Sequence, residues 1–257
     1  MTRGSHQGYC DALDAEIERM AETVRSADLS MRVPTCPDWS VADLIEHTGI
    51  VQRWAAEMVR QLSPERLDRA RMDVPVPEPV ARPDWLAEGA GDIVAVFRGS
   101  DPDASMWAWG ADKHARFWPR RMLHETTVHR TDAELALERE PVIAAEVAVD
   151  GIDELFDNLP HAASFRPHIG ELRGNGESLH FHCTDADGEW TIRLEPDGFS
   201  CERDHAPRAR SRCAVLLLTC CSSSTGAGRS LTTASSASAM TPSSPGGWST
   251  RPSSYSR

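Results

Sequence analysis

Apolar residues recur at helical spacing in five stretches of the first 160 residues. In the first stretch, Leu13, Ile17, Met20 and Val24 are separated by three or four positions, with acidic residues and arginines between them. Such a stripe is typical of an amphipathic helix that buries one face. The predicted helices cover residues 9–27, 40–62, 84–97, 115–137 and 141–159.

The second predicted helix carries the longest apolar stripe and follows a segment punctuated by prolines. Residues 33–39 read VPTCPDW, and neither proline fits the interior of a helix, so a loop is expected there. Asp38 or Ser40 can cap the helix that follows. The stripe runs in steps of three and four through Leu44, His47, Val51, Trp54, Met58 and Leu62.

The period changes to two beyond residue 160. Residues 177–184 and 189–195 alternate between polar and apolar positions, and the Asp-Gly pair at 187–188 predicts a hairpin turn between them. A second Asp-Gly pair at 197–198 leads into another short strand at 199–202. The fold class expected is therefore α+β, with a helical bundle over residues 1–145 and a small, partial α+β domain over residues 146–205.

The last segment, residues 206–257, has a different composition. It holds no Asp, Glu or Lys, whereas 20 of its 52 residues are Ser or Thr, and all 39 acidic residues precede it. A disordered polar tail is one interpretation. A frame-shifted end is the hypothesis we prefer, because GC-rich codons read out of frame yield Arg, Ser, Ala, Thr and Pro.

Charge and cysteine content exclude some partners. The net charge of −12 disfavours a nucleic-acid partner, and no apolar run is long enough to span a membrane. The seven cysteines form no C-x-x-C pair, and no apolar secretory segment precedes them, so a reduced, cytoplasmic setting is expected. The sequence does not indicate an oligomeric state.

Three ionisable residues on the predicted core-facing stripes are the candidate chemistry. Glu125 and His129 lie four residues apart and project from one face of the fourth helix. His47 interrupts the apolar stripe of the second helix. Two imidazoles and a carboxylate are ligands for a first-row metal, and three protein ligands leave a position for water or substrate. Asp43 and Asp132 are each placed to orient one of the imidazoles, although an ordinary acidic residue of a helix is the simpler interpretation of both.

Simpler readings apply to each of these residues. A histidine on an apolar face is often only a hydrogen-bonded core residue, and a Glu–His pair at this spacing is common on solvated helices. His114 and His124 are competing ligands, although His124 is rotated by about 100° from Glu125. His180 and His182 alternate on a predicted strand and read as a strand face.

Two segments resemble the mycothiol-dependent maleylpyruvate isomerase family, which is related to the DinB-like metal-binding four-helix bundles. They are CPDWSVADLIEHTG at residues 36–49 and ETTVHRTDAE at residues 125–134. The resemblance implies a zinc site formed by His47, Glu125 and His129, a helical metal-binding domain and an α+β C-terminal domain. The chain departs from the family pattern where the C-terminal domain should finish.

The resemblance also implies chemistry. The type enzyme uses a low-molecular-weight thiol, mycothiol, which adds to a cis double bond, allows rotation and is then eliminated to give the trans product. The function expected is that of a zinc-binding, mycothiol-dependent isomerase or thiol transferase acting on a small electrophilic substrate. The alternatives are a non-enzymatic metal- or thiol-binding regulatory protein and a metal-dependent hydrolase.

Overall fold

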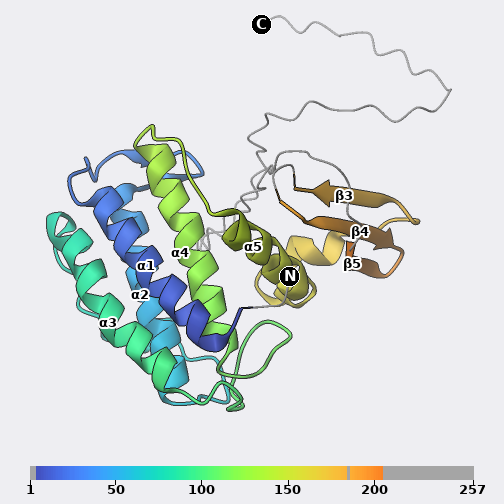
Figure 1. The fold of residues 1–257 in the computed structure, drawn as a ribbon, viewed down its shortest axis with the longest axis horizontal. Coiled ribbons are helices and arrows are strands. Elements are labelled where there is room, and N and C mark those ends of the chain that lie inside the picture. The colour runs from blue at the N-terminus through green and yellow to red at the C-terminus, as the bar shows by residue number, and fades with distance from the viewer. Residues whose placement is uncertain (1–3, 184–185, 205–257) are drawn as a thin grey trace, which may run out of the picture. The chain divides into compact units, whose positions relative to one another are not determined.

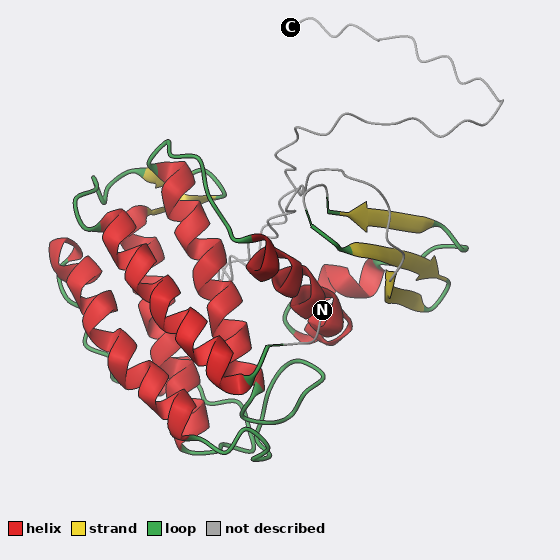
Figure 2. Cartoon of the chain, viewed as in Figure 1, coloured by secondary structure: helices red, strands yellow, loops and turns green. Residues whose placement is uncertain are grey.

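A computed structural model of the chain describes residues 4–183 and 186–204. The hypotheses about the tail at 206–257 lie outside the described residues, and the domain limits at residues 145 and 205 stay predictions. The described residues form five α-helices followed by a small antiparallel sheet, so the α+β class is confirmed (Figure 2). The helices are α1 (His6–Val24), α2 (Val41–Arg60), α3 (Arg82–Gly99), α4 (Phe117–Ala136) and α5 (Ala145–Asn158).

Helices α1 to α4 pack side by side around one hydrophobic core. Helix α1 contacts α3 and α4, and α2 contacts the same two helices (Figure 1). The predicted stripe of α1 is fully buried in this core, as are Leu44 and Met58 of α2. Leu62 is half exposed instead, because α2 ends at Arg60 and the stripe does not continue beyond it.

Ser40 fixes the start of α2. Its hydroxyl accepts the Asp43 backbone N–H, while the Asp43 carboxylate accepts the Ser40 backbone N–H, which completes a capping box. The segment before it is not the loop that its prolines predicted. It forms two short antiparallel strands, β1 (Arg32–Val33) and β2 (Cys36–Ser40), with an irregular register that accommodates Pro34 and Pro37.

The Trp-rich connection between α3 and α4 packs against the helices. The Trp107 ring stacks on Trp118 with centroids 6.0 Å apart, and Trp54 meets Trp118 edge-on at 5.3 Å. These aromatic contacts fill one end of the core. This connection is therefore held against the bundle by its tryptophans.

Helix α5 begins at Ala145, four residues later than the proline that was expected to open it. It contacts α4 on one side, while the sheet of β3 (Ser178–His182), β4 (Glu189–Glu195) and β5 (Gly198–Asp204) packs on it through aromatic contacts. Phe156 lies 5.7 Å from Phe181 and 6.3 Å from Trp190, centroid to centroid. The strand order β3-β4-β5 follows the chain, as two successive Asp-Gly turns predict. No helix among the described residues has the length and hydropathy needed to cross a membrane.

A polar cluster joins α5 to α1 and α4. The Asp150 carboxylate accepts hydrogen bonds from Tyr9 Oη at 2.9 Å, Arg120 Nε at 3.0 Å and His124 Nε2 at 2.7 Å. Burial raises the pKa of Asp150, but His124 and Arg120 outweigh it, so the pKa lies well below its usual range. A carboxyl whose pKa is lowered by folding stabilises the fold above its unfolded pKa, and that stability is lost as the pH falls.

We expect Asp150→Asn to lower the free energy of unfolding at pH 7 by about 3 kcal/mol, because Arg120 is left buried without its main partner. The gap between wild type and variant should narrow as the pH falls below about 4. Urea denaturation over a pH series measures both effects. The matched control is Asp157→Asn, since Asp157 contacts the same arginine at 3.2 Å but is 38% exposed. Asp157→Asn should lower the free energy of unfolding by no more than about 1 kcal/mol. Equal losses of stability in the two variants would contradict the assignment of Asp150 as the main partner of Arg120.

Candidate metal centre

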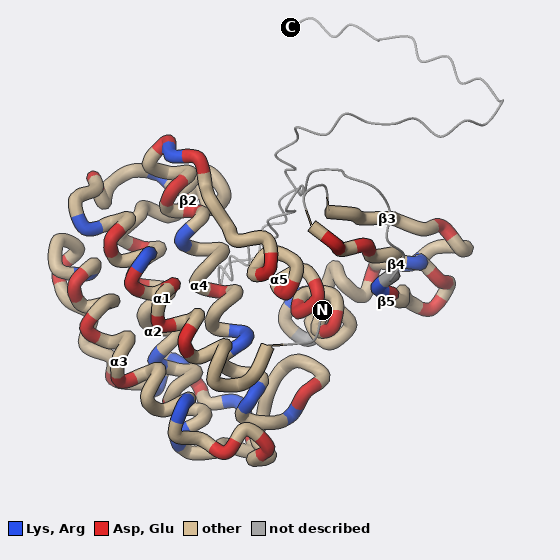
Figure 3. The backbone as a smooth tube through the Cα atoms, in the orientation of Figure 1, with Lys and Arg blue, Asp and Glu red and all other residues tan. Residues whose placement is uncertain are grey.

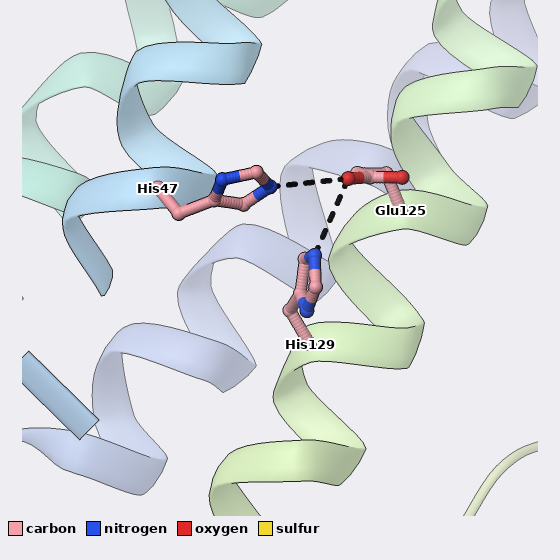
Figure 4. A group of neighbouring side chains, drawn as sticks. All are labelled: His47, Glu125 and His129. Carbon is pink, nitrogen blue, oxygen red and sulfur yellow. Dashed lines mark hydrogen bonds and ion pairs between the residues drawn. The ribbon is translucent and has the colours of Figure 1, made fainter. Parts of the chain in front are cut away.

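Two neighbouring helices supply the three residues singled out in the sequence. His47 lies in the second turn of α2, behind the Ser40 cap, and Glu125 and His129 lie one turn apart in the middle of α4. Because α2 and α4 pack against each other, the three side chains meet between them (Figure 4). Their nearest ligand atoms all lie within 4.8 Å of one another.

One carboxylate oxygen stands at the centre of the group. Glu125 Oε1 is 3.3 Å from His129 Nε2 and 3.5 Å from His47 Nε2. Donor atoms bound at 2.0–2.1 Å to a tetrahedral zinc ion lie about 3.3 Å apart. These two separations are therefore those expected of atoms that share one metal ion, and two imidazoles with one carboxylate form a known catalytic zinc set.

The hydrogen bonding of His47 also fits a metal. Its Nε2 atom is buried and makes no hydrogen bond among the described residues, although it approaches Glu125 Oε1 to the ion-pair distance of 3.5 Å. Burying such an atom without a hydrogen bond costs free energy. A cation between the three side chains would satisfy it, so the residues present fit a metal ion.

The His129 ring is oriented by a contact at its second ring nitrogen, Nδ1. His129 Nδ1 lies 3.0 Å from Asp132 Oδ2, and Thr35 Oγ1 donates to Asp132 Oδ1 at 2.6 Å. Both His129 and Asp132 are fully buried. A carboxylate on one ring nitrogen fixes the direction of the other, so of the two acids considered for this role Asp132 contacts an imidazole and Asp43 does not.

The charges of the metal-free site follow from these contacts. Burial lowers the pKa of His129, but Asp132 and Glu125 outweigh it and raise the pKa to about 10. Burial raises the pKa of Glu125, but contacts with His129 and His47 and the charge of Arg121 bring it well below its usual range. Burial lowers the pKa of His47. A cation at this position would take the place of the imidazolium proton as partner of Glu125.

Several other candidates are used elsewhere. Asp43 serves the helix cap, so it acts as an acidic residue of its own helix and does not orient the His47 ring. His124 binds Asp150 on α5, so it does not compete as a ligand. Arg130 pairs with Glu134 in its own helix and with Glu16 of α1. His180 and His182 stack along β3 at 5.9 Å, as residues of one strand face do.

Sequence reasoning missed three side chains at the site. The Trp39 ring on β2 lies 4.7 Å from the His47 ring and 6.2 Å from the His129 ring, centroid to centroid. Thr35 supports Asp132, and Arg121 donates to Glu125 Oε2 at 2.8 Å. Only Arg121 had a local signal, its spacing of four residues before Glu125. Trp39 lies on β2 and Thr35 in the turn between β1 and β2, a hairpin that the proline pattern did not predict.

Thr35→Val should remove one of the hydrogen bonds to the buried Asp132 carboxylate without changing the volume of the side chain much. Since a hydrogen bond to a charged group contributes roughly 1.5–3 kcal/mol, a loss of about 2 kcal/mol is expected in urea denaturation. Thr23→Val is the control, because the Thr23 hydroxyl makes only an exposed bond to Arg19 O in α1. Its effect should stay within about 0.5 kcal/mol, and similar losses from both variants would argue against the Thr35–Asp132 support.

Comparison with known proteins places the helical part of the chain in a family. No curated protein sequence matches the chain significantly, and no solved structure does. Residues 10–134 match the family described as the mycothiol maleylpyruvate isomerase N-terminal domain. The matched region runs from α1 to the last turns of α4 and includes the three residues that converge between α2 and α4. Residues 10–134 therefore belong to the mycothiol maleylpyruvate isomerase N-terminal domain family.

Proposed function

We propose that the chain binds a divalent metal, zinc, through His47, Glu125 and His129, and that it is a mycothiol-dependent isomerase or thiol transferase. One observation carries the metal assignment: the ligand atoms of these residues converge within 4.8 Å from two helices. The unsatisfied Nε2 of His47 supports it independently. The family of the helical domain supports the thiol.

The surrounding residues have defined tasks in this proposal. Asp132 holds the His129 ring so that Nε2 faces the site, and Arg121 holds one oxygen of Glu125 so that the other faces both imidazoles. The His47 and Glu125 side chains are only 14% and 12% exposed, so bulk water has little access. A bound zinc ion supplies Lewis acidity, which lowers the pKa of a coordinated thiol.

The partners proposed are small molecules. A thiol of the mycothiol class would bind at the open metal position, and a small electrophile such as an activated cis alkene would accept its sulfur. Acidic and basic side chains are interspersed along the helices (Figure 3), and the net charge of the chain is −12. A polyanionic partner such as nucleic acid does not fit this balance.

The metal assignment is tested by zinc binding. The metal-free wild type should bind one equivalent of zinc, and His47→Ala should bind it at least about 100-fold more weakly, since losing a ligand exceeds the 10–100-fold effect of outer groups. Competition with a chromophoric chelator measures both affinities. His180→Ala, which removes a half-exposed histidine of β3, is the matched control. Equal zinc affinity in the wild type and His47→Ala would refute the site.

The reaction is tested separately by the thiol dependence of turnover. Zinc-loaded protein should convert maleylpyruvate, the substrate that names the family, only when mycothiol is added, and His47→Ala should be inactive. Spectrophotometry of the substrate with and without thiol gives the answer. Zinc-dependent turnover without any thiol would point to a hydrolase. Zinc binding with neither thiol binding nor turnover would point to a regulatory protein.

A further inference from the structure

Helix α5 lies outside the matched family domain, yet one of its carboxylates is linked to the candidate metal centre. Arg121 on α4 donates from Nη2 to Glu125 Oε2 at 2.8 Å and from Nη1 to Glu154 Oε2 at 2.6 Å. Glu154 belongs to α5 and is only 2% exposed. One guanidinium therefore bridges a proposed ligand and a carboxylate from another helix.

The bridge determines which oxygen of Glu125 faces the imidazoles. With Oε2 held by Arg121, Oε1 is the atom that lies 3.3 Å from His129 and 3.5 Å from His47. Without Arg121 the two oxygens would be equivalent, and the carboxylate would be free to rotate about its last bond. Fixing the orientation of a ligand in this way strengthens its bond to a metal.

The Glu154 carboxylate is also held at its other oxygen, by a side chain of its own helix. Its Oε1 accepts a hydrogen bond from Asn158 Nδ2 at 3.0 Å, and Asn158 Oδ1 accepts the backbone N–H of Ala111 at 3.2 Å. Gly110 leaves the room for this contact, because a Cβ there would lie 2.1 Å from Asn158 Oδ1. Both oxygens of Glu154 are therefore engaged, and its position is tied to α5 and to the loop before α4.

The charge balance gives Glu154 a second effect. Glu125, Arg121 and Glu154 together carry one net negative charge, so Arg121 does not fully neutralise Glu125. If Glu154 were neutral, the whole positive charge of Arg121 would act on Glu125, and the carboxylate would attract a metal cation less. In a buried site this difference is screened only weakly.

We propose that Glu154 is a positioning residue of the metal centre, which acts through Arg121 to orient Glu125 and to preserve its charge. The inference rests on the proposed zinc site. It assigns to α5, a helix rich in acidic residues (Figure 3), a role in metal binding that the family domain at 10–134 does not contain. Other acidic residues of α5 face different partners: Asp150 faces Arg120 and His124, and Asp153 faces the sheet.

The test compares zinc affinities of the metal-free full chain by chelator competition. Glu154→Gln should weaken zinc binding about 10–100-fold, the range for groups that orient metal ligands. Asp153→Asn is the matched control, because Asp153 is the adjacent acid of α5 but accepts from Trp190 Nε1 and pairs with Arg203 on the sheet. It should leave the zinc affinity unchanged, whatever it does to the melting temperature.

A double variant separates positioning from a general loss of structure. In an Arg121→Met background, Glu154→Gln should weaken zinc binding no further, because Glu154 acts on Glu125 only through Arg121. Independent structural damage at the two positions would instead add. The absorption spectrum of the cobalt(II) form supplies a readout of coordination, and it should change in Glu154→Gln but not in Asp153→Asn.

The outcomes are distinguishable from failure of the site itself. If the wild type binds no zinc, the proposed function is wrong. If the wild type binds zinc, but Glu154→Gln binds it equally well with an unchanged cobalt spectrum, only the role of Glu154 is wrong. A loss in Asp153→Asn as large as that in Glu154→Gln would likewise overturn the inference.

Discussion

The fold depends on pairing the polar groups that α4 carries into the interior. This helix buries two arginines, two histidines, an aspartate and three threonines, a set that costs free energy unless every member has a partner. Their partners come from all around the helix. Glu16 reaches Arg130 from α1, Asp150 reaches Arg120 and His124 from α5, and Thr35 reaches Asp132 from the turn between β1 and β2.

These pairings explain why the site is built where it is. Because α4 is held on several sides by directional contacts, His129 and Glu125 have little freedom to rotate. His47 faces them from α2, whose start is fixed by the Ser40 capping box. The one atom left unsatisfied among the three is the Nε2 of His47. Other buried atoms nearby also make no hydrogen bond, among them Thr131 Oγ1 on α4, but the Nε2 of His47 is the one that lies beside two other potential metal ligands.

The hydrophobic pattern was sufficient to predict the helices but not every element between them. The stripe of α1 and the Asp-Gly hairpins of the sheet are local signals, and both were read correctly within a few residues. The strands β1 and β2 were missed because Pro34 and Pro37 argue locally against a strand, whereas an edge position tolerates them. Leu62 was wrongly placed on the buried stripe for a similar reason, since spacing along a helix does not say where the helix ends.

The sequence by itself determined the helical and strand periods, the α+β class, and the spacing that puts Glu125 and His129 on one face of a helix. Those features depend on residues close together in the chain. Only the tertiary structure decided that His47 meets them, that Asp132 is supported by Thr35, and that Glu154 reaches Glu125 through Arg121. Each of these contacts joins residues far apart in the sequence, and their geometry depends on how the helices pack, which no local pattern encodes.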